Sequence, residues 1–360
     1  MQLKSIWIQF HRWAGIIVGV FFLLSCISGA VLVFEKELNP VLYSAHFHHR
    51  ANPGGEVLPL DSLIHLAKGF AKPLKLQEVS IPTDFPNTSN LLFKTDGSRM
   101  ERNYLALHPY TGKLASTIPG NRHVFTFAEE FHRRLLLDDI GKKITGICCL
   151  IYVLILISGL ILWWPKNKKV MKQRMKVKWD ASRKRLNWDI HSAGGFYTLA
   201  LLFLMCMTGL TWSFKSFENG IYYIFDGKSK PKEEKTAFPK AQIAGDRSIY
   251  QDTYHKAVQL FGKENTILLD IAQEKTGMVR VLIDQDEHVF GGKNIGILHQ
   301  KLYKDQSNGT KVRGFMEPLH TASRFGIIGK SVYLLVVLFG ASMPVTGLYI
   351  WLGRKKKKKK

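Results

Sequence analysis

Charged residues are absent from four long stretches of this 360-residue chain, at positions 13–34, 144–164, 196–214 and 331–351. A helix needs about 20 apolar residues to cross the hydrocarbon core of a membrane. Buried helices of soluble proteins seldom reach that length without a Lys, Arg, Asp or Glu. The absence therefore argues against a soluble protein and predicts four transmembrane helices, with Trp and Tyr toward their ends. The first stretch is too long for the core of a cleaved signal peptide, so we expect it to be retained.

Cysteine is also scarce in this sequence. Its four residues, Cys26, Cys148, Cys149 and Cys206, all lie inside the apolar stretches. None is left for the segments between those stretches, which excludes a disulfide framework there. We interpret the four thiols as small side chains that pack between helices.

Acidic residues are outnumbered by basic ones, 28 to 51, and the formal net charge is +23. The excess is concentrated in two short segments, 166–185 and 354–360. Short basic flanks mark the cytoplasmic side of a bacterial inner-membrane protein, so we expect both termini and the 166–185 loop inside and the two long segments outside. The excess is a topology signal that also suits anionic lipid headgroups. It gives no reason to expect a nucleic-acid partner.

Two long patterns occur twice in the sequence. In residues 11–29 and 191–209, a His is followed by a Gly four residues later, and a hydroxyl residue plus Gly closes the pattern. In residues 131–164 and 319–352, a His precedes a Gly-Lys pair, a hydroxyl–Gly pair and a Trp at equal distances. Both halves begin and end on the same side, so we predict a parallel internal repeat about an axis along the membrane normal.

We therefore predict an α-helical integral membrane protein with four transmembrane helices and two small α+β exported domains. Each exported segment begins with helical periodicity and continues with short strand candidates, so we expect one helix on a small antiparallel sheet in each. The expected boundaries are 1–36 for the first transmembrane helix, 37–130 for the first exported domain, 131–165 for an outer His segment and the second helix, 166–187 for a basic cytoplasmic loop, 188–215 for the third helix, 216–316 for the second exported domain, 317–353 for an outer His segment and the fourth helix, and 354–360 for a basic cytoplasmic tail.

One histidine leads each predicted membrane helix: His11, His132, His191 and His320. Ionisable residues at membrane depth are candidates for function, and sites in four-helix bundles are built from side chains on facing helices. Two facing imidazoles are the arrangement that holds a haem iron from both sides. Two histidines alone leave zinc short of ligands. We expect His11 with His191, and His132 with His320, to be axial ligands of haem iron.

The second pair presents a geometric problem. His132 and His320 each lie eleven residues before the edge of the apolar stretch. On a straight helix this is about 16 Å beyond the edge and about 48 Å from the opposite edge, too far for one electron hop. Three alternatives remain. The helices bend near Gly141 and Gly329 and bring the pair inward, another carrier lies between, or these histidines are not ligands.

Other residues have a functional interpretation and a simpler one. The His46, His48 and His49 cluster has the composition of a metal-binding tract, but a loop is the simpler explanation. Four glycines would let a flat macrocycle approach the backbone, or would serve ordinary close helix packing. Three arginines are candidates for pairing with haem propionates, or for snorkelling to the interface. The glycines are Gly15, Gly19, Gly195 and Gly209, and the arginines are Arg12, Arg133 and Arg134.

The chain resembles the PepSY-associated transmembrane proteins, and within them the iron-regulated type with ferrioxamine-reductase activity. The matching elements are HRWAGIIVGVFFLLSCISGAVLVFEKEL (11–38), YLALHPYTGKL (104–114), FHRRLLLDDIGKKITG (131–146), ISGLILWWP (157–165) and WDIHSAGGFY (188–197). The resemblance implies two PepSY-like exported domains, b-type haem on the four helix-leading histidines, and reduction of ferric siderophores outside the cytoplasmic membrane. The chain departs from the family at His108, where Asp is usual, and its second exported segment lacks a clean copy of PYTG.

From the residues and the resemblance together we expect an electron-transfer protein with one or two haems b and a ferric siderophore as its acceptor. No Gly-rich dinucleotide motif follows a strand, so the electron donor is expected to be a quinol or a redox partner protein. Outer-sphere transfer needs no proton-transfer residue, and we name no catalytic side chain. Two rival hypotheses remain: a membrane-anchored module that binds or regulates a peptide or protease, and an accessory protein of siderophore or iron uptake.

Overall fold

The computed structural model describes residues 2–52, 54–231, 249–271, 277–292 and 294–358. The chain divides into two compact units. The helical unit comprises Met1–Glu35, Ala128–Lys230 and Asn308–Lys360, and the sheet unit comprises Lys36–Phe127 and Pro231–Ser307. The side chains of the expected basic tail, 354–360, lie outside the described part.

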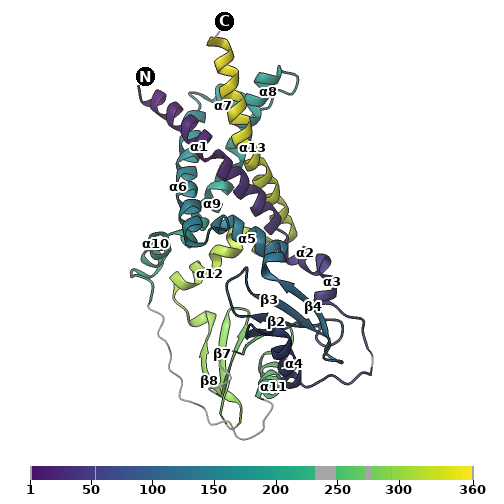
Figure 1. The fold of residues 1–360 in the computed structure, drawn as a ribbon. Coiled ribbons are helices and arrows are strands. Elements are labelled where there is room, and N and C mark those ends of the chain that lie inside the picture. Colours follow the sequence, from purple (N-terminus) through teal and green to yellow (C-terminus); the bar gives the residue numbers. More distant parts are fainter. Residues whose placement is uncertain (1, 53, 232–248, 272–276, 293, 359–360) are drawn as a thin grey trace. The chain divides into compact units, whose positions relative to one another are not determined.

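The helical unit contains the four expected membrane helices, which lie side by side in Figure 1. They are α1 (Gln2–Leu32), α6 (Asp138–Trp163), α9 (Gly195–Ser213) and α13 (Gly326–Lys358). Large apolar side chains are exposed along them; Ile17 and Leu335, for example, are each 68% exposed. An exposed apolar surface of this kind is suited to lipid rather than water. The chain is therefore a multi-pass membrane protein.

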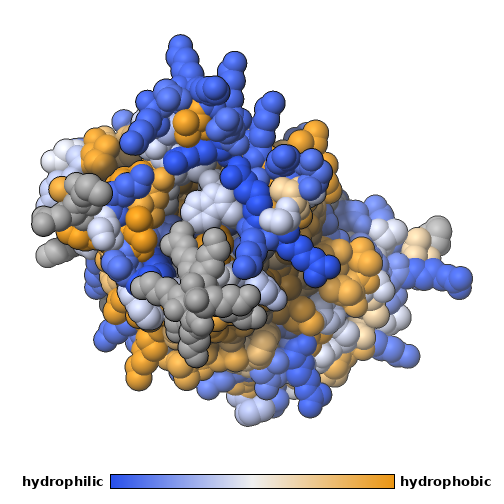
Figure 2. Space-filling model, turned by 90° about the horizontal axis from the view of Figure 1, so that it is seen from above, coloured by the Kyte–Doolittle hydropathy of each residue, from blue (hydrophilic) through white to orange (hydrophobic). Residues whose placement is uncertain are grey.

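The four helices form a ring around a common interior. Helix α1 packs against α6 and α13, and α9 packs against the same two helices, so α1 lies diagonally opposite α9. The ring centres of Trp13 and Trp351 are 6.2 Å apart, which places the first part of α1 beside the last part of α13. Both chain ends thus lie at one end of the bundle, called here the termini end (Figure 1). Figure 2 looks onto this end and shows hydrophilic residues gathered over it, with apolar residues around them.

Two short helices, α7 (Lys168–Arg174) and α8 (Arg183–Asp189), connect α6 to α9. Arg174 donates hydrogen bonds to the carbonyls of Leu162 and Trp164, at 3.3 and 3.4 Å, and so caps the end of α6. Helix α8 continues into α9 through one π-helical turn, Ile190–Gly194. A Cβ on Gly194 would lie 2.0 Å from the Phe339 ring, so only glycine permits the close approach of α13 there. Isolated π turns of this kind occur mostly at functional sites.

The sheet unit is built on one antiparallel sheet of eight strands. In sheet order they are β4 (Leu114–Pro119), β3 (Asn103–Leu107), β2 (Leu91–Thr95), β1 (Leu76–Ile81), β5 (Ile267–Asp270), β6 (Met278–Ile283), β7 (Asp286–Gly291) and β8 (Gly296–Lys301). At the centre β1 pairs with β5, with Val79 opposite Leu269 and Ile81 opposite Ile267. The sequence analysis expected two separate sheets. The structure corrects this: each long segment contributes four strands to one shared sheet.

One helix from each long segment packs on this sheet, α4 (Leu60–Ala71) and α11 (Ile249–Phe261), and the two also contact each other. The apolar residues of α4 recur at helical spacing and are buried with the inward side chains of the strands. The two helix starts are tied together: Asp61 accepts the backbone N–H of Gln251 at 2.9 Å, and the Gln251 side chain accepts that of Leu60 at 2.6 Å. Both helices were expected from periodicity.

Further short helices complete the chain. They are α2 (Glu35–Leu42), α3 (Ser44–Phe47), α5 (Val124–Arg134), α10 (Lys215–Asp226) and α12 (Asn308–Thr321), with 3-10 turns at Gly120–Arg122, Tyr303–Asp305 and Ser323–Phe325. The two halves of the chain thus present the same order: a span, short helices, a packing helix, four strands, a short helix and a second span.

Candidate functional site

His11 and His191 lie opposite each other inside the bundle, toward the termini end. His11 belongs to α1 and His191 to the π turn that leads into α9, so the pair spans the diagonal of the ring of helices. Their ring centres are 6.4 Å apart and the ring planes are at 89°. The structure brings these two residues together as the sequence analysis expected.

His132 and His320 form a second pair of the same kind. They lie near the ends of α5 and α12, the helices that precede α6 and α13. Their ring centres are 6.2 Å apart and the ring planes are at 66°. His132 Nδ1 is 2.9 Å from the carbonyl oxygen of Ser25, within the span of α1. The second pair therefore lies inside the bundle, and not about 16 Å beyond it as a straight helix would require.

A sharp turn before each second span brings these histidines inward. Between α5 and α6, Leu135, Leu136 and Asp138 adopt φ values of 52°, 59° and 46°. Before α13, Ala322 and Gly326 adopt φ values of 57° and 61°. This is the left-handed region, which L residues other than Gly enter at a cost. The bend named among the three alternatives is present, a few residues before the expected glycines.

The two glycines expected at the bends have a different role there. A Cβ on Gly141 would lie 1.5 Å from the carbonyl oxygen of Arg134, and one on Gly329 would lie 2.3 Å from Cβ of Phe325. Each glycine therefore admits the chain that folds back over the start of the second span. At each site, the left-handed residues form the bend and the glycine leaves room for the chain that folds back.

Each of the four histidines is held by a hydroxyl residue and the glycine that follows it on a neighbouring helix. The pairs are Ser158–Gly159 for His11, Thr346–Gly347 for His191, Ser28–Gly29 for His132 and Thr208–Gly209 for His320. The distance from Nδ1 to the hydroxyl oxygen is 2.8 Å in three cases and 3.2 Å at His132. A Cβ on the glycine would lie 3.1 to 3.7 Å from imidazole Cε1. The hydroxyl orients the ring, and the glycine leaves room for it.

Within each half of the chain, each membrane helix supplies the hydroxyl–Gly pair that holds the histidine belonging to the other membrane helix. Helix α1 carries His11 and receives support from α6, while it supports His132, which precedes α6. Helices α9 and α13 are related in the same way through His191 and His320. The two halves then meet through the two histidine pairs. Sequence reasoning noted the hydroxyl–Gly pairs as marks of duplication and missed this role.

The hydrogen bonds fix which ring nitrogen carries the proton. The hydroxyl of Thr208 donates to carbonyls of its own helix at 2.9 Å, and that of Thr346 does so at 3.0 Å, so each oxygen can only accept from a histidine. Nδ1 of His11 also faces the Ile155 carbonyl at 3.2 Å, and a carbonyl can only accept. In all four rings Nδ1–H is therefore the donor. Each neutral imidazole keeps the lone pair of Nε2 for another partner.

This donor set fits an iron held from two sides. Two metal–nitrogen bonds of about 2 Å each, with about 1 Å from each nitrogen to its ring centre, separate the ring centres by about 6 Å. The observed separations of 6.4 and 6.2 Å agree with that value. The angle between the two ring planes does not enter this distance. Among the described residues, no three or more His, Cys, Asp or Glu side chains are placed to hold one metal ion together.

The expected glycines and arginines divide between the two interpretations. A Cβ on Gly15 would have no described atom within 4 Å, whereas a Cβ on Gly19 would lie 3.0 Å from Cβ of Pro344, so Gly19 serves helix packing. A Cβ on Gly195 would lie 3.7 Å from the Met343 sulfur, and Gly209 belongs to the His320 support.

Arg133 and Arg134 form ion pairs with Glu129 and Glu130 on their own helix, at 2.9 and 3.4 Å. Arg12 lies over the Trp13 ring and bonds Gln9, but its Nε is buried and has no hydrogen-bond partner among the described residues. Arg12 therefore keeps one buried N–H donor for an anionic group beside His11.

The His46, His48 and His49 cluster does not converge on one point. His46 is buried and hydrogen-bonds Ser116 Oγ at 2.6 Å. His48 is exposed and forms a single β-bridge with Ser89. Both ring nitrogens of His49 face carbonyl oxygens, at 2.8 and 3.0 Å. The three side chains therefore share no metal point, but the expected loop is wrong for His46, which is buried in α3 (Ser44–Phe47).

Comparison with known proteins adds the family. The model of the PepSY-associated TM region matches residues 8–354, nearly the whole chain. The chain belongs to this family. The matched range includes both histidine pairs, the first membrane span from residue 8 onward and the other three spans in full. A comparison with curated proteins finds no match.

Proposed function

We propose that this PepSY-associated protein binds haem b at its two histidine pairs and transfers electrons to the Fe(III) of a siderophore. The observation that carries the proposal is the shared state of the four rings. Each histidine has Nδ1–H tied to a neighbouring helix, Nε2 left available, and a second such ring about 6 Å away across the bundle. A haem held there would supply one-electron chemistry.

The residues of the chain have three tasks in this proposal. The histidines bind iron through Nε2, and the hydroxyl residues hold each ring in the tautomer that makes this possible. The glycines keep the rings close to the supporting helices. The apolar helices exclude water, as shown by the burial of Leu202 and Leu210 in the bundle. If each histidine pair held iron from both sides, no ligand position would be left for substrate, and electron transfer would be of the outer-sphere type.

The spacing of the pairs supports a path along the bundle. Thr208, which holds His320, follows His191 by 17 residues, so the two pairs are about 25 Å apart along the helix. We assign the termini end to the cytoplasmic side of a bacterial inner membrane, from the basic segment 166–185. Electrons then enter near the first pair from a quinol or a redox partner protein. They leave near the second pair, where a ferric siderophore is reduced.

The test is to purify the full chain in detergent, quantify its haem, and record the visible spectrum before and after dithionite. We expect two haems per chain and sharp bands on reduction. The reduced protein should then be reoxidised by a ferric siderophore. Absence of haem bands would contradict the proposal.

A second candidate function rests on the edge of the sheet. All six residues of β8 are exposed, and β8 is the last strand in the sheet order. An exposed edge strand can pair with an extended peptide. If the protein is a peptide- or protease-binding module, His11→Ala and His191→Ala leave its binding unchanged. If it is the proposed reductase, they abolish reduction.

A further inference from the structure

The second histidine pair has a distinct neighbour on one side only. The ring of Trp212, at the end of α9, meets the ring of His320 edge to face, with centres 5.3 Å apart and planes at 85°. Trp212 is half-buried, so part of the residue is exposed at the surface of the helical unit. Among the described residues, His132 has no aromatic neighbour other than His320.

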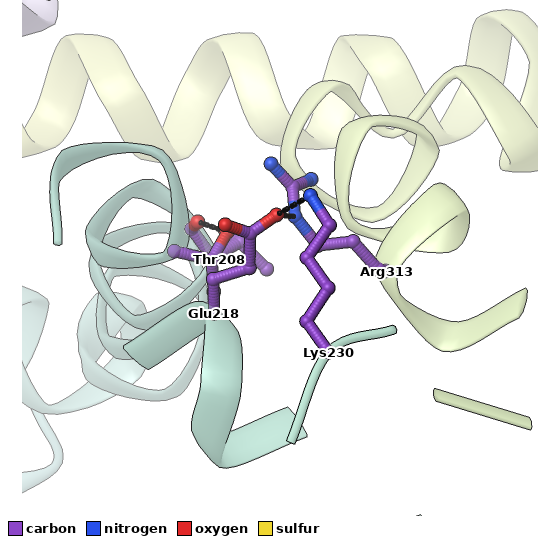
Figure 3. Close-up of polar contacts among 5 residues, drawn as sticks. Thr208, Glu218, Lys230 and Arg313 are labelled. Carbon is purple, nitrogen blue, oxygen red and sulfur yellow. Dashed lines mark hydrogen bonds and ion pairs between the residues drawn. The ribbon is translucent and has the colours of Figure 1, made fainter. Parts of the chain in front are cut away.

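A charged cluster covers the other side of this indole. The guanidinium carbon of Arg313, on α12, lies 5.4 Å from the Trp212 ring centre, a cation–π contact. Arg313 Nε is 3.2 Å from the Glu218 carboxylate, and Lys230 Nζ is 3.1 Å from the same oxygen. Figure 3 shows Arg313 and Lys230 converging on Glu218. One carboxylate thus orients two cations, and one of them is placed over Trp212.

The first half of the chain lacks this arrangement at the matching positions. Trp212 follows His191 by 21 residues, and the residue that follows His11 by 21 is Leu32. Arg313 precedes His320 by seven residues, and the residue that precedes His132 by seven is Phe125. Both halves supply the same histidines and supports, but only the second half has a Trp and an Arg at these positions. Because only the second half has this Trp, the second pair has a single aromatic route for electrons out of the bundle.

From this contact chain we propose that Trp212 is the outlet through which electrons leave the second pair toward an acceptor outside the bundle, and that Arg313 positions it. This inference rests on the proposed function. The indole provides a continuous path of packed atoms from the axial ligand His320 to the surface. The Arg313 cation makes oxidation of the indole itself unfavourable, so Trp212 conducts the electron without becoming a lasting radical.

The step balances with the partners already named. One electron leaves the iron bound by His132 and His320, and the Fe(III) of the chelate becomes Fe(II). No bond within the protein is broken and no proton moves. A reduced partner protein replaces this electron directly; a quinol supplies two electrons and releases two protons as it becomes the quinone, so one quinol serves the reduction of two Fe(III) ions.

The test compares three variants of the full, haem-loaded chain. Trp212→Leu introduces the residue found at the matching position, Trp212→Phe keeps an aromatic ring, and Trp164→Leu makes the same change at an exposed tryptophan of the termini end. Each protein is reduced with dithionite and mixed with a ferric trihydroxamate chelate in a stopped-flow instrument. We expect Trp212→Leu to slow reoxidation by about tenfold, equivalent to about 1.4 kcal/mol in the barrier. Trp212→Phe and Trp164→Leu should stay within about threefold.

Haem content, the electron paramagnetic resonance spectrum of the oxidised protein, and the two midpoint potentials are measured on the same samples. Trp212→Leu with full haem content and a normal reoxidation rate would overturn the inference and leave the proposed function intact. A wild-type chain without haem would overturn the proposed function itself.

If Trp212→Leu fails to retain haem, the midpoint potentials of the Arg313→Gln variant test the inference in its place. Loss of the nearby cation should lower the potential of the haem at the second pair and leave the first unchanged. Two unchanged potentials would contradict the positioning role.

Discussion

The histidines of the helical unit and those of the sheet unit show what separates a ligand candidate from a structural histidine. In the helical unit, each ring has Nδ1 tied down and another imidazole about 6 Å from its own. In the sheet unit, His123 bonds Thr126 at 2.8 Å through Nδ1 and Asn39 at 2.9 Å through Nε2, and His49 also uses both nitrogens. A histidine with both nitrogens occupied has nothing left for a metal. Local density of histidine is therefore a poorer guide than duplication at fixed spacing.

The largest expected effect tests this comparison directly. Replacing His191 by Ala removes one of the two proposed ligands of the first pair, so under the proposed function we expect the chain to lose one of two haems, which is half of its haem content. Replacing His49 by Ala, in the sheet unit, should change the haem content by less than a tenth. Haem-to-protein ratios from a pyridine haemochrome assay check both variants. Equal haem content in the two would contradict the assignment of the pairs.

In the sheet unit, we expect a buried histidine to make the free energy of unfolding depend on pH. Burial, and then the charge of nearby His123, lowers the pKa of His46 to about 4. In the unfolded chain the pKa of His46 is about 6.5. Between pH 6.5 and 4, His46 is therefore protonated in the unfolded state and not in the folded state. The free energy of unfolding should therefore fall with decreasing pH, by up to about 3 kcal/mol from this residue.

Unfolding of the full chain in detergent, followed from pH 7.5 to 4.5, measures this loss. His46→Gln should flatten the dependence, and His255→Gln, at an exposed position, should leave it as it is. A His46→Gln curve as steep as that of the wild type would show that acid sensitivity arises elsewhere.

What the sequence could predict follows from the range of the interactions involved. The four spans and the four helix-leading histidines depend on composition and spacing, which are visible in one chain. Helices α4 and α11 depend on local periodicity and were also found. The pairing of β1 with β5 joins segments almost 200 residues apart, and no local pattern encodes it. Strands β2 and β8 were missed, because LLFKT is short and GILHQK is exposed throughout.

The candidate site, like the fold, was predictable only in part from the sequence. Duplicated spacing identified the ligand candidates and their pairing. The position of the bends escaped, because Leu135, Leu136 and Asp138 are ordinary residues in a left-handed conformation, which sequence propensities disfavour. The supports escaped because Ser158 and Thr346 act on histidines of other helices, and only the packing of the bundle reveals that contact. Their regular place in both halves was the available signal.

The supports predict an effect of intermediate size. Thr208→Val keeps the shape of the side chain and removes the acceptor of the His320 Nδ1 proton. Loss of such an outer partner typically weakens metal binding by about 10- to 100-fold. The rate of haem transfer to an excess of a haem-scavenging protein measures the change. Thr198→Val is the matched control on α9, because the Thr198 hydroxyl donates to the Gly194 carbonyl and contacts no histidine. Faster haem loss in both variants would point to general loosening of the helix.

The smallest expected effect distinguishes the four supports from one another. A Cβ on Gly29 would lie 3.1 Å from His132 Cε1, so the ring must move, whereas a Cβ on Gly209 would lie 3.7 Å from His320 Cε1, an ordinary contact. Gly→Ala within a helix otherwise stabilises it by about 1 kcal/mol. We therefore expect Gly29→Ala to weaken haem binding by about threefold to tenfold and Gly209→Ala to leave it within twofold, with no loss of helix stability in either. Haem titration of the apoprotein gives both affinities. If Gly209→Ala were the weaker binder, the close approach at Gly29 would have no part in holding His132.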